Sequence, residues 1–360
     1  MDSELADTSS QGEAWEVAAD ETGAMSSLSK PATIYDVAKL AGVSHQTVSR
    51  FIKGYQGIRP ATRDKVVSAL DQLGYRPNLT ARSLKSGRSH RIAALTHEIN
   101  QIGPSRIVQG ASMAARQAGY LLDIIALDMG DPAAIQEALD LAAQLDIAGV
   151  LALASTDEMA EAFQHTDFRV PVVFAPEVDD AVTGHPSELT TVGFPALIAH
   201  LQQLGHERIL HIAGPTTWSA ARNRARAFES TLRTNGLLPI GNVSGDWSAS
   251  SGYQAIRDVP NLFGATAVVA SNDQMALGAI LALTEAGLRV PDDVSVTGID
   301  DIPEAAFFRP PLTTLRVDFE EDGRIAVDKL LSSIEDARPT SESSPGATLI
   351  VRQSTGPAPS

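Results

Sequence analysis

The sequence predicts a small all-α helix-turn-helix unit followed by an α/β body of two parallel-sheet subdomains. Three observations predict this fold class. Residues 31–91 contain eleven Lys and Arg against three acids, although the whole chain carries a net charge of −16. Residues 33–74 show helical periodicity interrupted by glycines. After residue 91, short apolar runs alternate with helical patterns, which is typical of parallel sheets covered by helices on both faces.

The composition excludes several classes of protein. The 360 residues include no cysteine, so disulfides, thiolate nucleophiles and Cys-ligated metals are excluded. No apolar run approaches the roughly 18 residues of a membrane span. The acidic N-terminus has no basic region or apolar core of a secretory signal, so we expect a cytoplasmic, nucleoid-associated protein. Residues 1–30 hold seven acids and no periodicity, which predicts a disordered leader, with Met25 as an alternative start.

The first two predicted helices have clear start and stop signals. Thr33 and Asp36 form a capping box, an apolar face follows at helical spacing, and Gly42 ends the helix. Ser44 caps the second helix, and the glycine-containing turn between the two predicts a helix-turn-helix. Pro60 opens a third helix, which completes a domain over residues 31–76.

The second of these helices begins with side chains that hydrogen-bond. Its first turn is His45-Gln46-Thr47, followed by Ser49 and Arg50. This part of a helix-turn-helix enters the major groove, where such groups contact base edges and phosphates. A three-helix domain without nucleic acid is the alternative, and the donor-rich helix favours DNA.

Residues 77–90 predict a short hinge helix and linker. Asn78 caps the segment, Gly87 ends it, and it is too short to be stable alone. Leu84 stands between Arg82 and Lys85, a pattern that suits a minor-groove wedge. An inert linker helix is the alternative.

The stretch 33–50, the Tyr-Arg-Pro-Asn at 75–78 and the Ala-Arg-Ser-Leu at 81–84 resemble the DNA-binding headpiece of the lac repressor/galactose repressor family. The resemblance continues to about residue 356, and stretches at 244–249, 272–279, 287–290 and 310–314 are most similar to the lac member. It implies a periplasmic-binding-protein-like body over residues 91–356. It also implies DNA contacts from Thr33, Ile34, Tyr35, Ser44, His45, Gln46, Thr47, Ser49, Arg50, Lys53, Thr62, Asn78, Ala81, Arg82, Leu84 and Lys85.

The body alternates predicted strands and helices. We expect the strands at 92–95, 121–127, 149–153, 170–174, 208–213, 266–270, 294–299 and 348–352. We expect the helices near 105–118, 133–145, 195–204, 220–235, 250–257, 274–286 and 319–335. The resemblance implies an N-subdomain of about 91–191 and 318–346 and a C-subdomain of about 192–317 and 347–356.

Polar and aromatic side chains follow several of these strands, where ligands of open parallel sheets bind. A carboxylate, an amide, a guanidinium and an aromatic ring together describe a carbohydrate site. From position alone the alternatives stay open, since Asp273 and Asp301 can cap helices and Trp247 can be core. The resemblance implies an effector site of Arg224, Trp247, Asn272, Asp300 and Phe319.

This chain departs from the family pattern at three positions of the predicted pocket. Met129, Pro176 and Val317 stand where the lac member has an Arg, an Asp and a Gln. The family's Asp-Asn-x-x-Gly after the crossing is also missing, because Val192-Gly193-Phe194-Pro195 stands there. The effector therefore need not be a galactoside.

The sequence lacks dinucleotide, phosphate-loop, nucleophile-elbow and zinc-protease motifs, so we expect no enzyme, no cofactor and no metal. We expect a sugar-responsive repressor that binds an inverted-repeat operator, with induction as the favoured response. A transport-type sugar-binding protein and a transcriptional activator are the alternatives. We expect a homodimer joined through the helix around 107–118, whose small residues permit close approach of a second copy, and no tetramer, since residues 353–360 hold no heptad.

Overall fold

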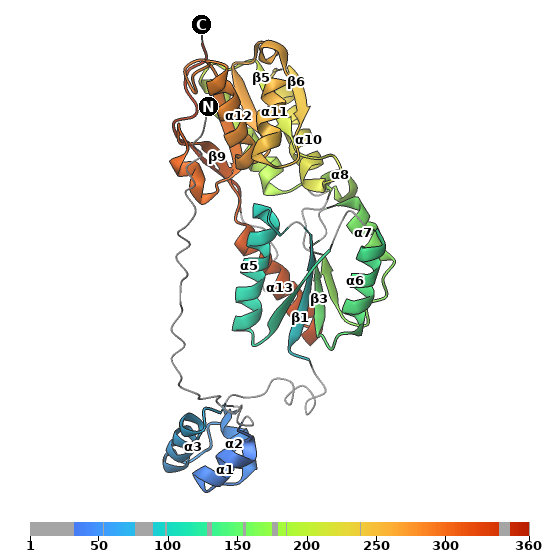
Figure 1. Cartoon of the computed structure of the whole chain (residues 1–360), viewed down its shortest axis with the longest axis vertical. Helices are drawn as coiled ribbons and strands as arrows, with labels where there is room; N and C mark the ends of the chain where they lie inside the picture. Colours follow the sequence, from blue (N-terminus) through green and yellow to red (C-terminus); the bar gives the residue numbers. More distant parts are fainter. Residues whose placement is uncertain are drawn as a thin grey trace, which may run out of the picture. The chain divides into compact units, whose positions relative to one another are not determined.

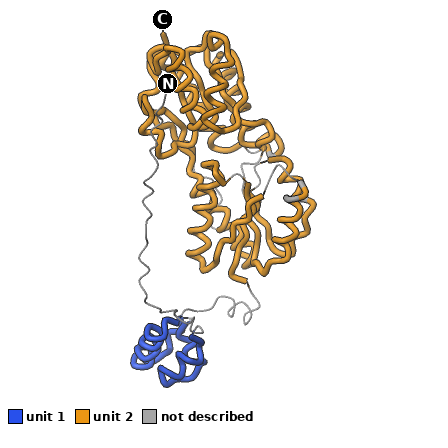
Figure 2. Tube along the Cα trace, viewed as in Figure 1, with its two compact units in different colours: residues 1–82 blue, residues 83–360 orange. Residues whose placement is uncertain are grey.

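The computed structural model describes residues 32–52, 54–75, 89–97, 99–127, 132–153, 156–174, 179–184, 186–237, 239–337 and 346–359. It divides the chain into two compact units, residues 1–82 and 83–360 (Figure 2). The expected leader, the hinge at 77–88 and Lys53 lie outside the described residues. The predicted domain boundaries therefore remain predictions.

The first unit consists of α1 (Ile34–Ala41), α2 (His45–Ile52) and α3 (Pro60–Gln72). The predicted capping box is present, because Thr33 Oγ1 accepts from the Asp36 amide and the Asp36 carboxylate accepts from the Thr33 amide at 2.8 Å. The Ser44 hydroxyl accepts from the Thr47 amide at 3.2 Å and so begins α2. The helices enclose a small core of Val37, Ala38, Ala41, Val48, Val66 and Ala69. The helix-turn-helix prediction is confirmed.

The second unit contains two sheets, which define an N-lobe and a C-lobe (Figure 1). The N-lobe sheet has the order β2-β1-β3-β4, and every pair in it is parallel. Its strands are β1 (Arg91–Thr96), β2 (Leu121–Ala126), β3 (Gly149–Ala152) and β4 (Val172–Phe174). The helices α5 (Ile102–Gln117) and α13 (Phe319–Glu335) pack on one face, and α6 (Pro132–Gln144) and α7 (Asp157–Gln164) pack on the other.

The close contact between α5 and α13 overturns one expectation. A Cβ added to Gly110 would lie 1.9 Å from the Glu320 carbonyl oxygen, and one added to Gly323 would lie 2.0 Å from that of Ile107. Ala111 and Ala115 are fully buried in the same contact. The small residues of α5 therefore permit close approach of α13 in the same chain, and the prediction that they receive a second copy is wrong.

The C-lobe sheet has the order β10-β9-β8-β7-β5-β6, and only the β10–β9 pair is antiparallel among the described strands. Its strands are β5 (Ile209–Ala213), β6 (Gly241–Ser244), β7 (Ala267–Ala270), β8 (Ser295–Asp300), β9 (Thr313–Arg316) and β10 (Thr348–Ile350). One face is covered by α9 (Phe194–Gln203) and α10 (Ser219–Thr234). The other face is covered by α11 (Ala249–Arg257) and α12 (Asp273–Glu285).

The end of the chain is bound to the C-lobe. The predicted last strand ends at Ile350 rather than at residue 352. The Gly356 amide donates to the Ser295 hydroxyl at 3.0 Å, and the buried His206 ring lies 3.0 Å from the Gly356 carbonyl oxygen. His206 therefore stabilises the attachment of the tail to the body.

Candidate functional site

The first unit places a cluster of polar and aromatic side chains at the start of α2. Tyr35, His45, Gln46 and Arg50 are exposed. The rings of Tyr35 and His45 lie 5.2 Å apart, and the Arg50 guanidinium lies 5.8 Å from the ring of Tyr55. Five predicted DNA contacts are half-buried or exposed around this cluster: Thr33, Ile34, Ser44, Thr47 and Ser49. Thr62 is half-buried at the start of α3, while Asn78, Ala81, Arg82, Leu84 and Lys85 lie outside the described residues.

A pocket in the second unit is lined by residues of both lobes and holds about 700 Å³ of space, part of it open to solvent. Every predicted effector residue lines it. The lining residues are Gln101, Ile102, Gly103, Pro104, Ile107, Leu153, Trp218, Ala220, Arg224, Trp247, Asn272, Gln274, Asp300 and Phe319.

The polar end of the pocket contains a buried ion pair. α10 presents Arg224 and the carboxyl end of β8 presents Asp300, and their Nη2 and Oδ1 atoms lie 3.5 Å apart. Both side chains are only 6% exposed. The Arg224 guanidinium also donates through Nη1 to the Ser271 carbonyl and lies 5.4 Å from the Trp247 ring. The Arg224 guanidinium is therefore held at the wall by contacts besides the ion pair.

Two buried donors at this wall have no hydrogen-bond acceptor among the described residues. They are Arg224 Nε and Trp247 Nε1. A buried donor without an acceptor costs about 1–3 kcal/mol. A ligand with hydroxyl or carbonyl oxygens at this wall would supply acceptors.

Asn272 and Asp273 hold the start of α12 in place. The Asn272 side chain accepts from the Met275 amide at 2.8 Å and donates to the Trp247 carbonyl at 2.9 Å. Asp273 does not cap the helix. Its carboxylate accepts from the Thr314 hydroxyl at 2.6 Å and the Ile302 amide at 2.8 Å. Burial and the neighbouring Asp300 charge raise the pKa of Asp273 well above its usual value.

Asp301 does not cap a helix either. Its carboxylate accepts from Arg316 at 2.7 Å and from Arg352 at 2.6 Å. These two pairs join the end of β8 to β9 and to the residues after β10. Asp301 therefore stabilises the edge of the C-lobe sheet rather than a helix.

Aromatic side chains form the other walls. Phe319, the first residue of α13, contacts the Gly103 backbone, and a Cβ placed there would lie 3.6 Å from its ring. Trp247 is 6% exposed and packs edge-on against Trp218, with ring centroids 5.7 Å apart. Trp218 was not predicted, because it precedes α10 and does not directly follow a strand. Trp247 therefore belongs to the core and to the pocket at once.

Two other described residues near the pocket residues in the sequence, Arg222 and Val317, do not line the pocket. Arg222, which lies on α10 two residues before Arg224, pairs with Asp157 and Asp179. Val317 packs against the C-lobe core, whereas Met129 and Pro176 lie outside the described residues. Within the described residues, no cluster of three or more His, Asp or Glu side chains is arranged to hold a metal ion. None of the described helices is long and apolar enough to cross a membrane.

Comparison with known proteins agrees with this architecture. Residues 33–78 match the family model of bacterial regulatory proteins of the lacI family, and residues 198–355 match a periplasmic binding protein-like domain. The lactose operon repressor of Escherichia coli (strain K12) is 36% identical over 308 residues, which cover 84% of each chain. The ribose operon repressor of the same strain is 34% identical over 310 residues, which cover 84% of this chain and 93% of the relative.

A solved structure of the lac repressor dimer, bound to operator and the anti-inducer ONPF, is also similar. Its TM-score is 0.76 and its identity is 32%, and the match covers 91% of this chain and 100% of that one. A helix-turn-helix unit joined to a two-lobed ligand-binding body defines a ligand-responsive DNA-binding regulator. The chain belongs to the lacI family of bacterial regulatory proteins. It is a transcriptional repressor and not an enzyme.

Proposed function

We propose that this repressor acts as a homodimer in the cytoplasm, binds an inverted-repeat operator through its helix-turn-helix units, and releases it when a small carbohydrate occupies the pocket. The observation that carries the proposal is the pocket wall where the buried Arg224–Asp300 pair meets the Trp247 ring, which packs against Trp218. Paired donors and acceptors suit adjacent hydroxyls, and aromatic rings suit the apolar face of a sugar.

The dimer follows from the symmetry of the operator. A palindromic site needs two headpieces related by a two-fold axis. The solved relative is a dimer on its operator. On α5, the side that faces away from α13 exposes Gln109, Ser112, Met113 and Arg116, and we assign the N-lobe contact to this side. The hinge residues Asn78, Ala81, Arg82, Leu84 and Lys85 are proposed to contact the minor groove between the half-sites.

The DNA half of the proposal is tested by selecting bound duplexes from a random library, which should return an inverted repeat. On that duplex, Arg50→Ala is expected to weaken binding by about 1–3 kcal/mol, because a good base contact contributes about that much. Lys65→Ala is the charge-matched control on the exposed face of α3, and it should lower affinity equally for selected and random DNA. Equal losses for Arg50→Ala on both duplexes would contradict the assignment of Arg50 to base recognition.

The effector half is tested by titrating the complex with a panel of mono- and disaccharides. At least one sugar is expected to raise the thermal midpoint of the free protein and to release the selected duplex. At a temperature below its thermal midpoint, Asp300→Asn should bind the duplex and resist release by that sugar, because loss of one hydrogen-bonded partner of the ligand costs about 1–3 kcal/mol. If every sugar leaves both measurements unchanged, the ligand is not a carbohydrate.

A further inference from the structure

The two lobes touch at the start of α7 and the start of α10. Thr156, which caps α7 in the N-lobe, pairs with Trp218 as an isolated antiparallel β-bridge. Trp218 is the residue that precedes α10 in the C-lobe. The main chains of the two lobes are therefore paired at this point.

A second contact lies one helical turn further along α10. Arg222 follows Trp218 by four residues, so the two share one side of the helix start. Asp157 follows Thr156 directly. The Arg222 Nη2 and Nη1 atoms donate to the two Asp157 carboxylate oxygens at 2.8 and 3.0 Å. The adjacent N-lobe residues Thr156 and Asp157 thus contact Trp218 and Arg222, which share one side of the start of α10 in the C-lobe.

Contacts besides the one with Asp157 fix the orientation of the Arg222 side chain. Its Nε donates to Asp179 at 2.8 Å, and its Nη1 also donates to the Thr216 carbonyl at 2.7 Å. Asp179 precedes α8 (Asp180–Thr183), which contacts α10. Burial would raise the pKa of Asp179, but hydrogen bonds from Arg222 and the Ala181 amide and the Arg226 charge lower it overall. The guanidinium therefore presents its outer edge to Asp157 in a fixed orientation.

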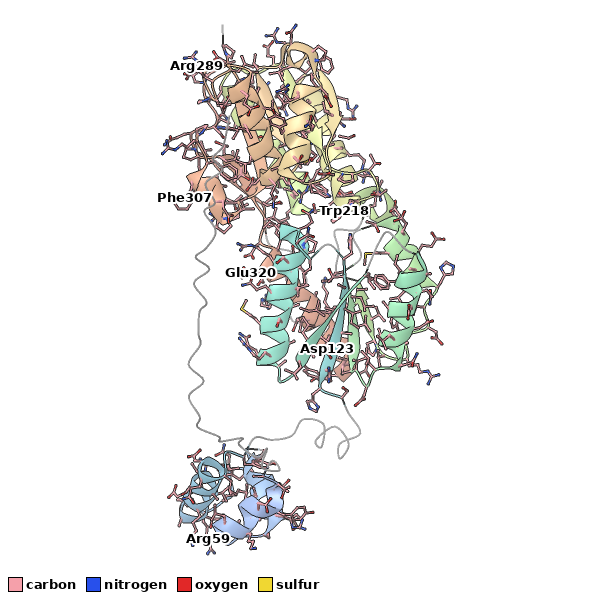
Figure 3. All side chains as sticks on the ribbon, viewed as in Figure 1. Arg59, Asp123, Trp218, Arg289, Phe307 and Glu320 are labelled. Atoms are coloured by element: carbon pink, nitrogen blue, oxygen red, sulfur yellow. The ribbon has the colours of Figure 1, made fainter. Side chains whose placement is uncertain are left out.

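The Trp218 side chain connects this contact between the lobes to the pocket. The Trp218 ring lines the pocket and lies edge-on to Trp247, at 5.7 Å. On its other side it packs against the buried His97 at the end of β1, at 4.8 Å. Figure 3 shows Trp218 in the C-lobe, at the edge that faces the N-lobe. A ligand in the pocket therefore meets the residue whose backbone joins the lobes.

We infer that the Thr156–Trp218 bridge and the Arg222–Asp157 pair form a lobe latch, which holds the two lobes in one relative orientation and reports pocket occupancy through Trp218. The inference goes beyond the proposed function, because it does not depend on the identity of the effector. Two arrangements of such lobes differ by a few kcal/mol at most, so a modest contact changes their populations measurably. Asp157 is 69% exposed, so we expect its loss to lower the ratio of latched to unlatched molecules about two- to fivefold.

The first test measures the distance between the lobes without any ligand. Because the chain has no cysteine, Glu137→Cys on α6 and Gln203→Cys on α9 give a clean pair of exposed spin-label sites. Asp157→Asn should broaden or shift the distance distribution. Glu158→Gln is the matched control, since it removes the same charge from the next exposed residue of α7. A distribution for Asp157→Asn equal to that of Glu158→Gln would overturn the latch.

The second test uses the protein's own fluorescence. The chain has three tryptophans, so Trp15→Phe leaves only Trp218 and Trp247 as emitters. Both are less than 10% exposed, and acrylamide should quench them weakly. Asp157→Asn in this background should increase the quenching constant, whereas Glu158→Gln should not. Equal quenching in all three proteins, with unchanged thermal midpoints, would show that the ion pair does not hold the lobes together.

Discussion

Arg224→Ala is expected to lower the free energy of unfolding of the body by about 3–5 kcal/mol. Breaking a buried ion pair by removing one partner typically costs about this much, because the remaining charge stays in a low-dielectric site and loses the nearest opposite charge. Here the remaining charge is Asp300, and the buried carboxyl of Asp273 lies close enough to feel it. Urea denaturation at pH 7, followed by tryptophan fluorescence, measures the loss.

A matched control lies on the same helix. Arg233 pairs with Glu229 at 3.6 Å and is 62% exposed, so Arg233→Ala should change stability by less than about 1 kcal/mol. If the two variants unfold at the same urea concentration, the Arg224–Asp300 pair contributes nothing to the body.

Local patterns in the sequence were sufficient to predict the three helices of the first unit and most strands of the body. The capping box at Thr33 and the glycine after α1 are chemical signals that act within one helical turn. Likewise, Asn272 and Asp300 directly follow apolar strands, and the edge of a parallel sheet brings such residues together. The five predicted effector residues are accordingly found in one pocket.

Features that depend on tertiary contacts were not predictable in this way. β9 begins with two threonines, and both are fully buried because the C-terminal tail and Asp273 satisfy their polar groups. β6 is an edge strand with a single apolar core residue, Val243. The eight-residue helix α7 was also missed, since its C-cap is His165 and it lacks the glycine that ends α1. Trp218 lines the pocket because it packs against Trp247, and the small residues of α5 are buried because α13 packs against them. Neither contact can be read from the local sequence.

His97→Phe is expected to remove part of the acid sensitivity of the body. Burial lowers the pKa of His97 to about 4, from an ordinary value of 6.5. Between pH 6.5 and pH 4, His97 binds a proton in the unfolded chain but not in the folded chain. The stability contributed by the neutral ring is therefore complete above about pH 6.5 and is lost as the pH falls towards 4. Over that range the loss is on the order of 3 kcal/mol, since one pKa unit corresponds to about 1.4 kcal/mol.

Phenylalanine is a suitable replacement because the His97 ring packs on Trp218, and neither of its nitrogens has a hydrogen-bond partner among the described residues. At pH 7.5 the variant should differ from the wild type by no more than about 1–3 kcal/mol, because the phenyl ring is slightly larger than imidazole and must fit a packed core. Between pH 7.5 and pH 4.5 the stability of the variant relative to the wild type should rise by about 2–3 kcal/mol. His211, whose pKa burial lowers to about 3, keeps both proteins acid-sensitive. Urea midpoints measured at intervals of half a pH unit give the two curves, and parallel curves would mean that His97 does not titrate differently in the folded and unfolded chains.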